Sequence, residues 1–282
     1  MRGLASVAFT LTCVWAQDGL QRAEELYNRT DYRASLAVLR ESGDSTARTH
    51  FLAGRDHFML GEYKKATDDF QKALAAEPSR SEYAHWLGRT YGRRAEMSNF
   101  LSAASYASKA RQYFEHAVEL DGSNEEALND LFDFYLQAPG FLGGGYDKAQ
   151  AIAQRIAEKN PAEGHFAEAQ LADRKKQYDT AEEQLRRAME LAPRQVGRML
   201  DLAKYLAKRG RYQESDAVFD KAEKLAPNAP KVLYARATTY VQQKRNLEKA
   251  KKLLVRYLES QLSPEDPPKE AAERLLKQAS GG

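Results

Sequence analysis

Small and apolar residues recur along the chain in triples whose members are spaced first by four residues and then by three. This spacing places the three members of a triple on one stripe of an α-helix. Successive triples begin 32 to 44 residues apart, and the other two members move by the same steps. The first triple is the weakest copy. The triples are Ala34, Val38, Glu41; Ala66, Phe70, Ala73; Ala110, Phe114, Ala117; Ala149, Ala153, Ile156; Ala181, Leu185, Ala188; Ser215, Phe219, Ala222; and Ala250, Leu254, Tyr257.

A helix stop follows most triples, five residues after the last member. Proline ends a helix because it has no N–H to donate and disfavours helix in the residue before it. A second helical segment precedes the triples, for example over residues 81–95 and 196–209. The pattern therefore predicts an all-α chain of helix–turn–helix pairs, with Gly61 and Gly210 at tight turns within two pairs. The stops are Pro78, Gly122, Pro161, Pro193 and Pro227.

Further residues make the chain resemble the tetratricopeptide repeat family. Trp86-Leu87-Gly88 followed by Tyr91 matches the first-helix signature of such a repeat, and two other segments match nearly whole repeats. The resemblance covers residues 18–263. It implies a right-handed superhelical solenoid of about seven helix pairs, whose neighbours stack because one pair cannot bury its apolar stripe alone. The matching residues in the two segments are Gly54, Gly61, Ala66, Phe70, Ala73 and Pro78, and Leu202, Gly210, Phe219, Ala222 and Pro227.

The two ends of the chain differ from the repeated region, residues 17–263. Residues 1–16 hold a positive start and a charge-free apolar run, which is typical of a secretory signal peptide and too short to span a bilayer. The alternative, a first helix of the domain, lacks capping residues and an amphipathic pattern. The only cysteine, Cys13, lies in this segment. Residues 264–282 are expected to form a capping helix and a tail.

Two connections are longer than the repeat requires. Extra residues within 95–109 form either two helices that are each extended by about a turn or a longer loop. Extra residues within 138–146 bring three glycines before a helix, and this loop is interpreted as a chain reversal because it lacks the phosphate-loop pattern. Loops of this kind often carry function. Phe100, Phe141 and Leu142 are the candidate contact residues on the two connections.

Composition and motifs give no argument for catalysis. The 43 basic and 40 acidic residues leave a net charge of +3, which indicates no general attraction to nucleic acid. No HExxH or Gly-x-Ser-x-Gly motif occurs, and His50 and His57 share a helix face without a third ligand at metal spacing. We therefore expect no enzyme activity, no catalytic residues, no metal, no cofactor and no membrane span in the mature chain.

The resemblance also implies where a partner would bind, because in this family the first helix of each pair lines the concave surface. Aromatic rings beside Arg or Lys suit an extended peptide with acidic groups. An alternative is that these side chains only solvate a helix face. The candidate groove residues are Phe51, Arg55, Phe58, His85, Arg89, Arg93, Asn129, Asp133, Phe166, Gln170, Lys204, Lys208, Tyr234 and Thr238.

The sequence thus favours a non-enzymatic interaction scaffold of the cell envelope, exported to the periplasm or secreted, that binds a protein or peptide of unknown identity. The alternative is a periplasmic solute-binding or transport-accessory protein that holds a small ligand in its helical cavity. Native mass spectrometry distinguishes the two, because only the second would carry a bound small molecule.

Export gives the first testable prediction. The charge-free run ends in Val14-Trp15-Ala16, which offers small residues where signal peptidase cleaves. N-terminal sequencing of the secreted product should therefore start at Gln17, within one residue. An intact Met1 in a soluble cytoplasmic pool would contradict export.

Overall fold

The computed structural model describes residues 18–281, apart from the side chain of Phe100. The predicted signal peptide, with Cys13, lies outside the described residues. Across residues 18–281 all regular elements are helices, which confirms the all-α class. The described residues divide into two compact units, unit 1 up to Ile152 and unit 2 from Ala153 onward.

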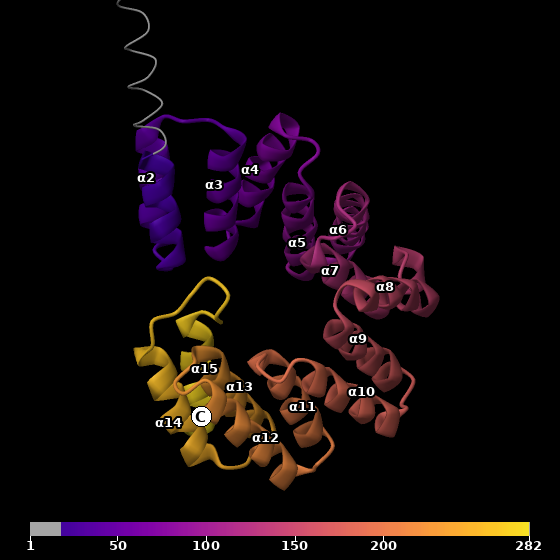
Figure 1. Ribbon diagram of the computed structural model, residues 1–282. Helices are drawn as coiled ribbons and strands as arrows, with labels where there is room; N and C mark the ends of the chain where they lie inside the picture. Colours follow the sequence, from indigo (N-terminus) through magenta and orange to yellow (C-terminus); the bar gives the residue numbers. More distant parts are fainter. Residues whose placement is uncertain (1–17, 282) are drawn as a thin grey trace, which may run out of the picture. The chain divides into compact units, whose positions relative to one another are not determined.

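Unit 1 is built from helix pairs that follow one another along the chain (Figure 1). Within it α3 packs on α4 and α5 on α6, while the first helices of successive pairs also touch, α3 with α5 and α5 with α7. Its elements are a helix over residues 18–28, α2 (Tyr32–Ser42), α3 (Ala47–Met59), α4 (Tyr63–Ala76), α5 (Ser81–Glu96), α6 (Phe100–Leu120), α7 (Glu125–Gln137), the short 3₁₀ helix η1 (Gly140–Leu142) and the start of α8 (Tyr146–Lys159).

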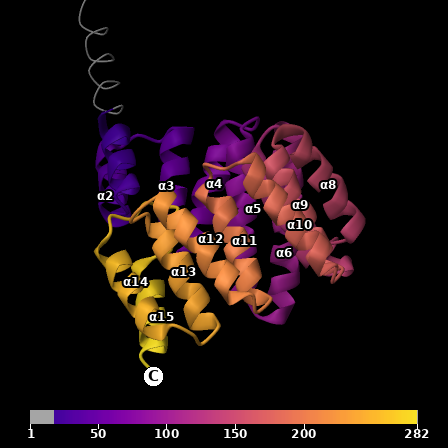
Figure 2. The same cartoon turned by 60° about the horizontal axis from the view of Figure 1, so that its bottom comes forward.

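Unit 2 repeats the arrangement, and Figure 2 shows α11, α12 and α13 side by side. The pairs are α9 with α10, α11 with α12 and α13 with α14, and α15 packs against α14 and α13. The last helix, α15, buries Ala272 and Ala279. The helices are α9 (Pro161–Arg174), α10 (Tyr178–Leu191), α11 (Val196–Lys208), α12 (Tyr212–Leu225), α13 (Pro230–Gln242), α14 (Leu247–Glu259) and α15 (Lys269–Ala279).

The repeated triples form the core of the second helices, as predicted. Every member of the six triples from Ala66 to Tyr257 is buried. The predicted stops are also confirmed, because α4, α6, α8, α10 and α12 each end two residues before the proline or glycine. Gly61 and Gly210 take positive φ angles of 75° and 77°, which only glycine adopts without strain.

The prediction of the first triple was wrong by one residue, because α2 buries the residues that follow Ala34 and Val38. Ala34 and Val38 are half-buried and Glu41 is exposed, whereas α2 buries Ser35 and Leu39. Leu39 packs with Ala23, Tyr27 and Leu52, and Ser35 donates a hydrogen bond of 2.7 Å to the buried carboxylate of Asp56 on α3. Ser35 is therefore the buried residue because it has a polar partner on α3, whereas the pattern of apolar residues favoured Ala34.

The two long connections have different structures. The extra residues of 95–109 extend α5 to 16 residues and α6 to 21, so only a short turn separates these helices and no long loop forms there. Residues 138–145 form an irregular loop that contains η1. In this loop Gly145 N–H donates to the Tyr135 carbonyl at 2.8 Å, which holds the loop against the end of α7.

Close helix approach within a pair depends on glycine facing a ring. A Cβ built on Gly54 would lie 2.6 Å from the Phe70 ring, and one on Gly88 would lie 2.5 Å from the Phe114 ring. Both distances are shorter than real Cβ contacts. The ring of the second helix therefore occupies the space that a side chain on the first helix would need.

Two glycines of α5 provide a matched test of this packing. Gly88→Ala should lower the free energy of unfolding by about 1–3 kcal/mol through overpacking against Phe114, more than the helix propensity of alanine restores. Gly92→Ala should raise it by up to about 1 kcal/mol, because its Cβ would meet no described atom within 4 Å. Urea unfolding measures both, and equal stability of the two variants would contradict the close contact.

Candidate binding pocket

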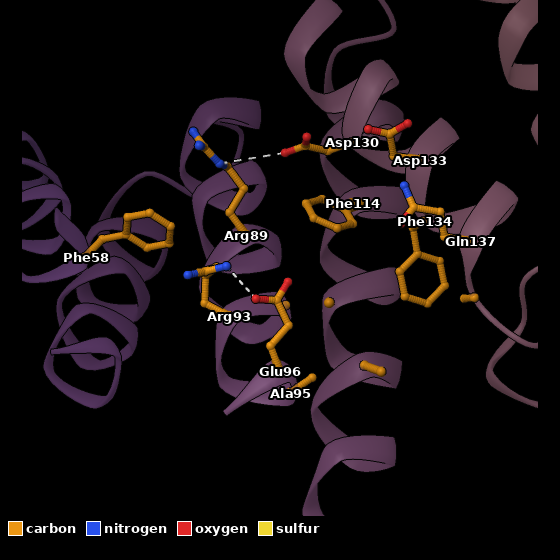
Figure 3. A pocket seen from close by; sticks show the side chains of 14 residues that line it. Phe58, Arg89, Arg93, Ala95, Glu96, Phe114, Asp130, Asp133, Phe134 and Gln137 are labelled. Atoms are coloured by element: carbon orange, nitrogen blue, oxygen red, sulfur yellow. Dashed lines mark hydrogen bonds and ion pairs between the residues drawn. The ribbon is translucent and has the colours of Figure 1, made fainter. Parts of the chain in front are cut away.

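A pocket of about 400 Å³ opens in unit 1 between α3, α5, α6 and α7 (Figure 3). It brings together four of the predicted groove residues, Phe58, Arg89, Arg93 and Asp133. They come from the first helices of three successive pairs, as the resemblance implied. The other lining residues are Gly92, Ala95, Glu96, Ala107, Ala110, Phe114, Asp130, Phe134, Gln137 and Ala138, which the sequence analysis did not single out as site residues.

Arg89 is held in place by aromatic rings. Its guanidinium carbon lies 4.4 Å from the centroid of the Trp86 ring and 5.5 Å from that of Phe58. Such cation–π contacts contribute about 0.5–1 kcal/mol at exposed sites. Its Nε lies 3.8 Å from an Asp130 oxygen across the pocket. Figure 3 shows this pair joining the α5 wall to the α7 wall.

The same Asp130 carboxylate is fixed from behind by a buried histidine. His85 Nε2 lies 2.8 Å from Asp130 Oδ2, while His85 is only 1% exposed. The expectation that His85 offers surface to a partner was therefore wrong. The residue that His85 contacts, Asp130, stands 45 positions later in the chain, on α7. The sequence pattern identified the helix face of His85 but not this partner.

The charges that line the pocket are of both signs. Arg93 is paired with Glu96 on its own helix and also lies 3.4 Å from the Tyr63 hydroxyl. Arg89 and Arg93 face three carboxylates, those of Glu96, Asp130 and Asp133. The sequence analysis favoured acidic groups in the ligand because of the arginines alone. The structure does not support acidic groups in the ligand, because carboxylates of the protein already line the pocket beside the arginines.

The interior of the pocket is apolar. Gly92, Ala95, Ala107 and Ala110 line it from α5 and α6, where their small side chains leave space between the helices. Phe114 lies behind this space, and Phe134 and Phe58 stand on opposite sides of it (Figure 3). Ala107 stands three residues before Ala110, which is the position at which α4, α8, α10, α12 and α14 begin relative to their own triples, so the site uses the part of α6 that corresponds to an ordinary second helix.

Phe51 and Arg55 line a second hollow of unit 1, of about 360 Å³, together with Tyr27 and Arg48. Phe51 is 8% exposed and packs at 4.6 Å between ring centroids on Tyr83, so its expected exposure was also wrong. Arg55 stacks 4.2 Å from the Tyr27 centroid. Asn129 lies on α7 and lines neither hollow.

In unit 2 three of the predicted groove residues, Phe166, Lys208 and Tyr234, are engaged with their own neighbours. Arg198 stacks on Phe166 at 4.2 Å, and Lys208 donates to Asp173 at 2.8 Å. Tyr234 packs on Tyr257, with ring centroids 5.1 Å apart. Gln170 and Thr238 are half-buried on α9 and α13, whereas Lys204 is exposed on α11. Charged side chains line an open hollow of about 650 Å³ elsewhere in this unit, where Glu182 pairs with Arg186 and Arg211.

The predicted loop contacts differ in exposure. Phe141 on η1 is 77% exposed, and Leu142 is half-buried. Phe100 is the first residue of α6, and its side chain lies outside the described part of the structure. Exposed apolar side chains that the sequence analysis did not single out as contacts are Met97 at the end of α5 and Leu101 at the start of α6.

Other chemistry-bearing residues form structural contacts. The rings of His50 and His57 face the two oxygens of Asp69 at 3.7 and 3.6 Å. Within residues 18–281, no group of three His, Cys, Asp or Glu side chains is placed to hold a metal ion. None of the helices in the described part of the chain is long and apolar enough to cross a membrane.

Comparison with known proteins identifies the family. Residues 47–80 and 162–195, which cover α3–α4 and α9–α10, each match a sequence model described as tetratricopeptide repeat. Stacked helix pairs with these matches define a helical repeat protein. The chain therefore contains tetratricopeptide repeats. A search of curated proteins gave no match.

Several solved structures share this fold. A tetratricopeptide repeat protein from Parabacteroides merdae aligns with a TM-score of 0.61 at 16% identity, over 95% of this chain and 99% of its own. A thermophilic TPR protein of Thermus thermophilus aligns with a TM-score of 0.53 at 20% identity, over 71% of this chain and 98% of its own. The human IFIT1 dimer with PPP-AAAA aligns with a TM-score of 0.55 at 17% identity, over 86% of this chain and 54% of its own. At these identities the likeness shows the fold alone.

The buried carboxyl of Asp56, next to Arg55, gives a prediction of pH dependence. Burial raises the pKa of Asp56 to about 7, while the Ser35 hydrogen bond and the Arg55 charge act in the opposite direction. Asp56 Oδ1 has no hydrogen-bond partner among the described residues. The folded state therefore holds the proton more tightly than the unfolded chain, whose aspartate pKa is about 4.

It follows that the contribution of Asp56 to stability is present below about pH 4 and is lost as the pH rises to about 7. Asp56→Asn mimics the protonated carboxyl. Its free energy of unfolding relative to wild type should therefore rise by roughly 2–4 kcal/mol between pH 4 and pH 7.5. Urea unfolding at both pH values measures this difference, and Asp68→Asn on the exposed face of α4 is the control. A difference that does not change with pH would show that Asp56 is not buried as described.

Proposed function

We propose that this protein is a non-enzymatic scaffold that holds a segment of a protein partner in the pocket of unit 1. Its fold is that of an interaction scaffold, since tetratricopeptide repeats generally serve that role. The observation that carries the proposal is the convergence of Phe58, Arg89 and Asp133, from three successive first helices, on one pocket. Side chains from several repeats can then contact one extended segment at the same time.

The pocket has the features of a binding hot spot. Aromatic and arginine side chains dominate the binding energy of protein interfaces, and they do so in desolvated pockets. Here Arg89 is held in position by Trp86 and Phe58 before any partner arrives, so little side-chain entropy is lost on binding. We also propose that the protein acts in the periplasm or outside the cell, on the strength of the apolar run that precedes Gln17.

A second candidate function is the capture of a small solute. The observation in its favour is the pocket volume of about 400 Å³, which lies within the usual range of about 300–1,000 Å³ for small-molecule sites. Native mass spectrometry of the protein purified from its own cells separates the candidates. A bound solute of constant mass that is lost on blocking the pocket would favour this second function.

The scaffold proposal is tested by blocking the pocket. Ala107→Trp should fill the space between α5 and α6 and reduce capture of the partner at least tenfold, measured by quantitative mass spectrometry of proteins retained from an extract of the source cells. Ala75→Trp is the matched control, because it places the same side chain on the exposed face of α4. Both variants should keep the helical circular dichroism of the wild type. Proteins retained equally by all three would contradict binding at this pocket.

A further inference from the structure

The pocket of unit 1 combines an apolar interior with charges that are already paired. On this basis we propose that it receives an aromatic side chain, Phe, Tyr or Trp, projecting from the partner protein. This inference rests on the proposed scaffold function and adds the chemistry of the residue that enters the site.

The charges around the pocket disfavour a charged anchor. Arg93 is paired with Glu96, and Arg89 lies 3.8 Å from Asp130, which His85 also contacts. Asp133 is engaged in an interaction as well. A carboxylate or ammonium group from the partner would have to displace one member of these pairs and leave another charge without compensation, which is costly in a partly buried site. The anchor is therefore a neutral side chain.

The rings in the wall favour an aromatic anchor over an aliphatic one. Phe114, Phe134 and Phe58 face the space from three sides, and offset or edge-to-face ring pairs gain energy beyond area burial (Figure 3). Arg93 lies 5.8 Å from the Tyr63 ring and also lines the pocket, so an inserted ring would provide a second π-face for its guanidinium. Arg–ring stacking recurs in this unit, as in Arg94 on Tyr106 at 4.3 Å.

Small residues in the wall leave room for a large side chain in the pocket. Gly92 and Ala95 on α5 face Ala107 and Ala110 on α6, and at Gly92 even an added Cβ would meet no described atom within 4 Å. The volume of about 400 Å³ accepts a large side chain with part of its backbone.

The occupant is a protein segment because an exposed apolar side chain follows the pocket lining closely along the chain. The lining ends with Gln137 and Ala138, where α7 passes into the loop that carries Phe141. Phe141 is 77% exposed only three residues after Ala138. A polypeptide that leaves the pocket in this direction gains a second apolar contact, which a free solute of one ring does not reach.

The inference is tested with random peptides displayed on phage. Wild type should select peptides that share one aromatic position, and Ala107→Trp should select none of them, while Ala75→Trp should select the same set as wild type. A synthetic copy of the best peptide then carries Phe, cyclohexylalanine, Leu, Glu or Lys at that position. Calorimetric titration should give about threefold weaker binding for cyclohexylalanine and at least tenfold weaker binding for Glu and Lys.

A wall variant checks that the rings are responsible. Phe134→Leu keeps an apolar wall, so it should bind the Leu peptide as well as wild type does and should reduce the preference for Phe over cyclohexylalanine. The free probe N-acetylphenylalanine amide should bind at least a hundredfold more weakly than the peptide.

The possible failures are distinguishable. Pocket-dependent selection of peptides with an acidic, basic or aliphatic anchor would overturn this inference and leave the scaffold function standing. Equal binding of the free probe and the peptide would also overturn it, in favour of a solute site. Failure of wild type to select any peptide would contradict the scaffold function and the inference together.

Discussion

The contact between a glycine on one helix and a phenylalanine ring on the next determines much of this structure. At Gly88 the Phe114 ring lies where a Cβ would be, so α5 and α6 approach as closely as their backbones allow. The same arrangement joins Gly54 to Phe70 in the preceding pair. These two pairs are held at a short distance, and their first helices, α3 and α5, lie side by side. Phe114 also lines the pocket, so one ring serves both the packing and the site.

The arginines of unit 1 depend on the same aromatic core. Arg55, Arg89 and Arg94 each stack on a ring of that unit, Tyr27, Trp86 and Tyr106 respectively, with separations of 4.2 to 4.4 Å. Stacking fixes the guanidinium groups, and the charge of Arg89 also lies near the carboxylate of Asp130 on α7. The result is an ordered surface around the pocket, where rings, arginines and carboxylates are interspersed. Such a surface recognises shape and aromatic character rather than net charge, which is consistent with a total charge of only +3.

The sequence predicted the fold well because helix packing leaves a periodic trace. Ala66, Phe70 and Ala73 are buried as expected, and the helices end where proline requires it. The site was predicted only in part. Phe58, Arg89, Arg93 and Asp133 do meet in one pocket, yet Phe51 and His85 are covered by Tyr83 and Asp130. Covering depends on residues from other helices, and a pattern along one helix contains no information about them. The additional length of α6 was visible as extra sequence between the helices of its pair.

The central claim is that a protein partner inserts into the pocket between α5, α6 and α7, and photo-crosslinking tests it most directly. A benzophenone amino acid replaces Gln137, on the exposed rim of the pocket, or Glu119, on an exposed part of α6. Irradiation of the protein in its own cells, followed by mass spectrometry, identifies the linked peptide. The account predicts a crosslink to one partner segment from position 137, with an aromatic residue near the linked site, and none from position 119. Crosslinks to that partner from position 119 but not from position 137 would contradict it.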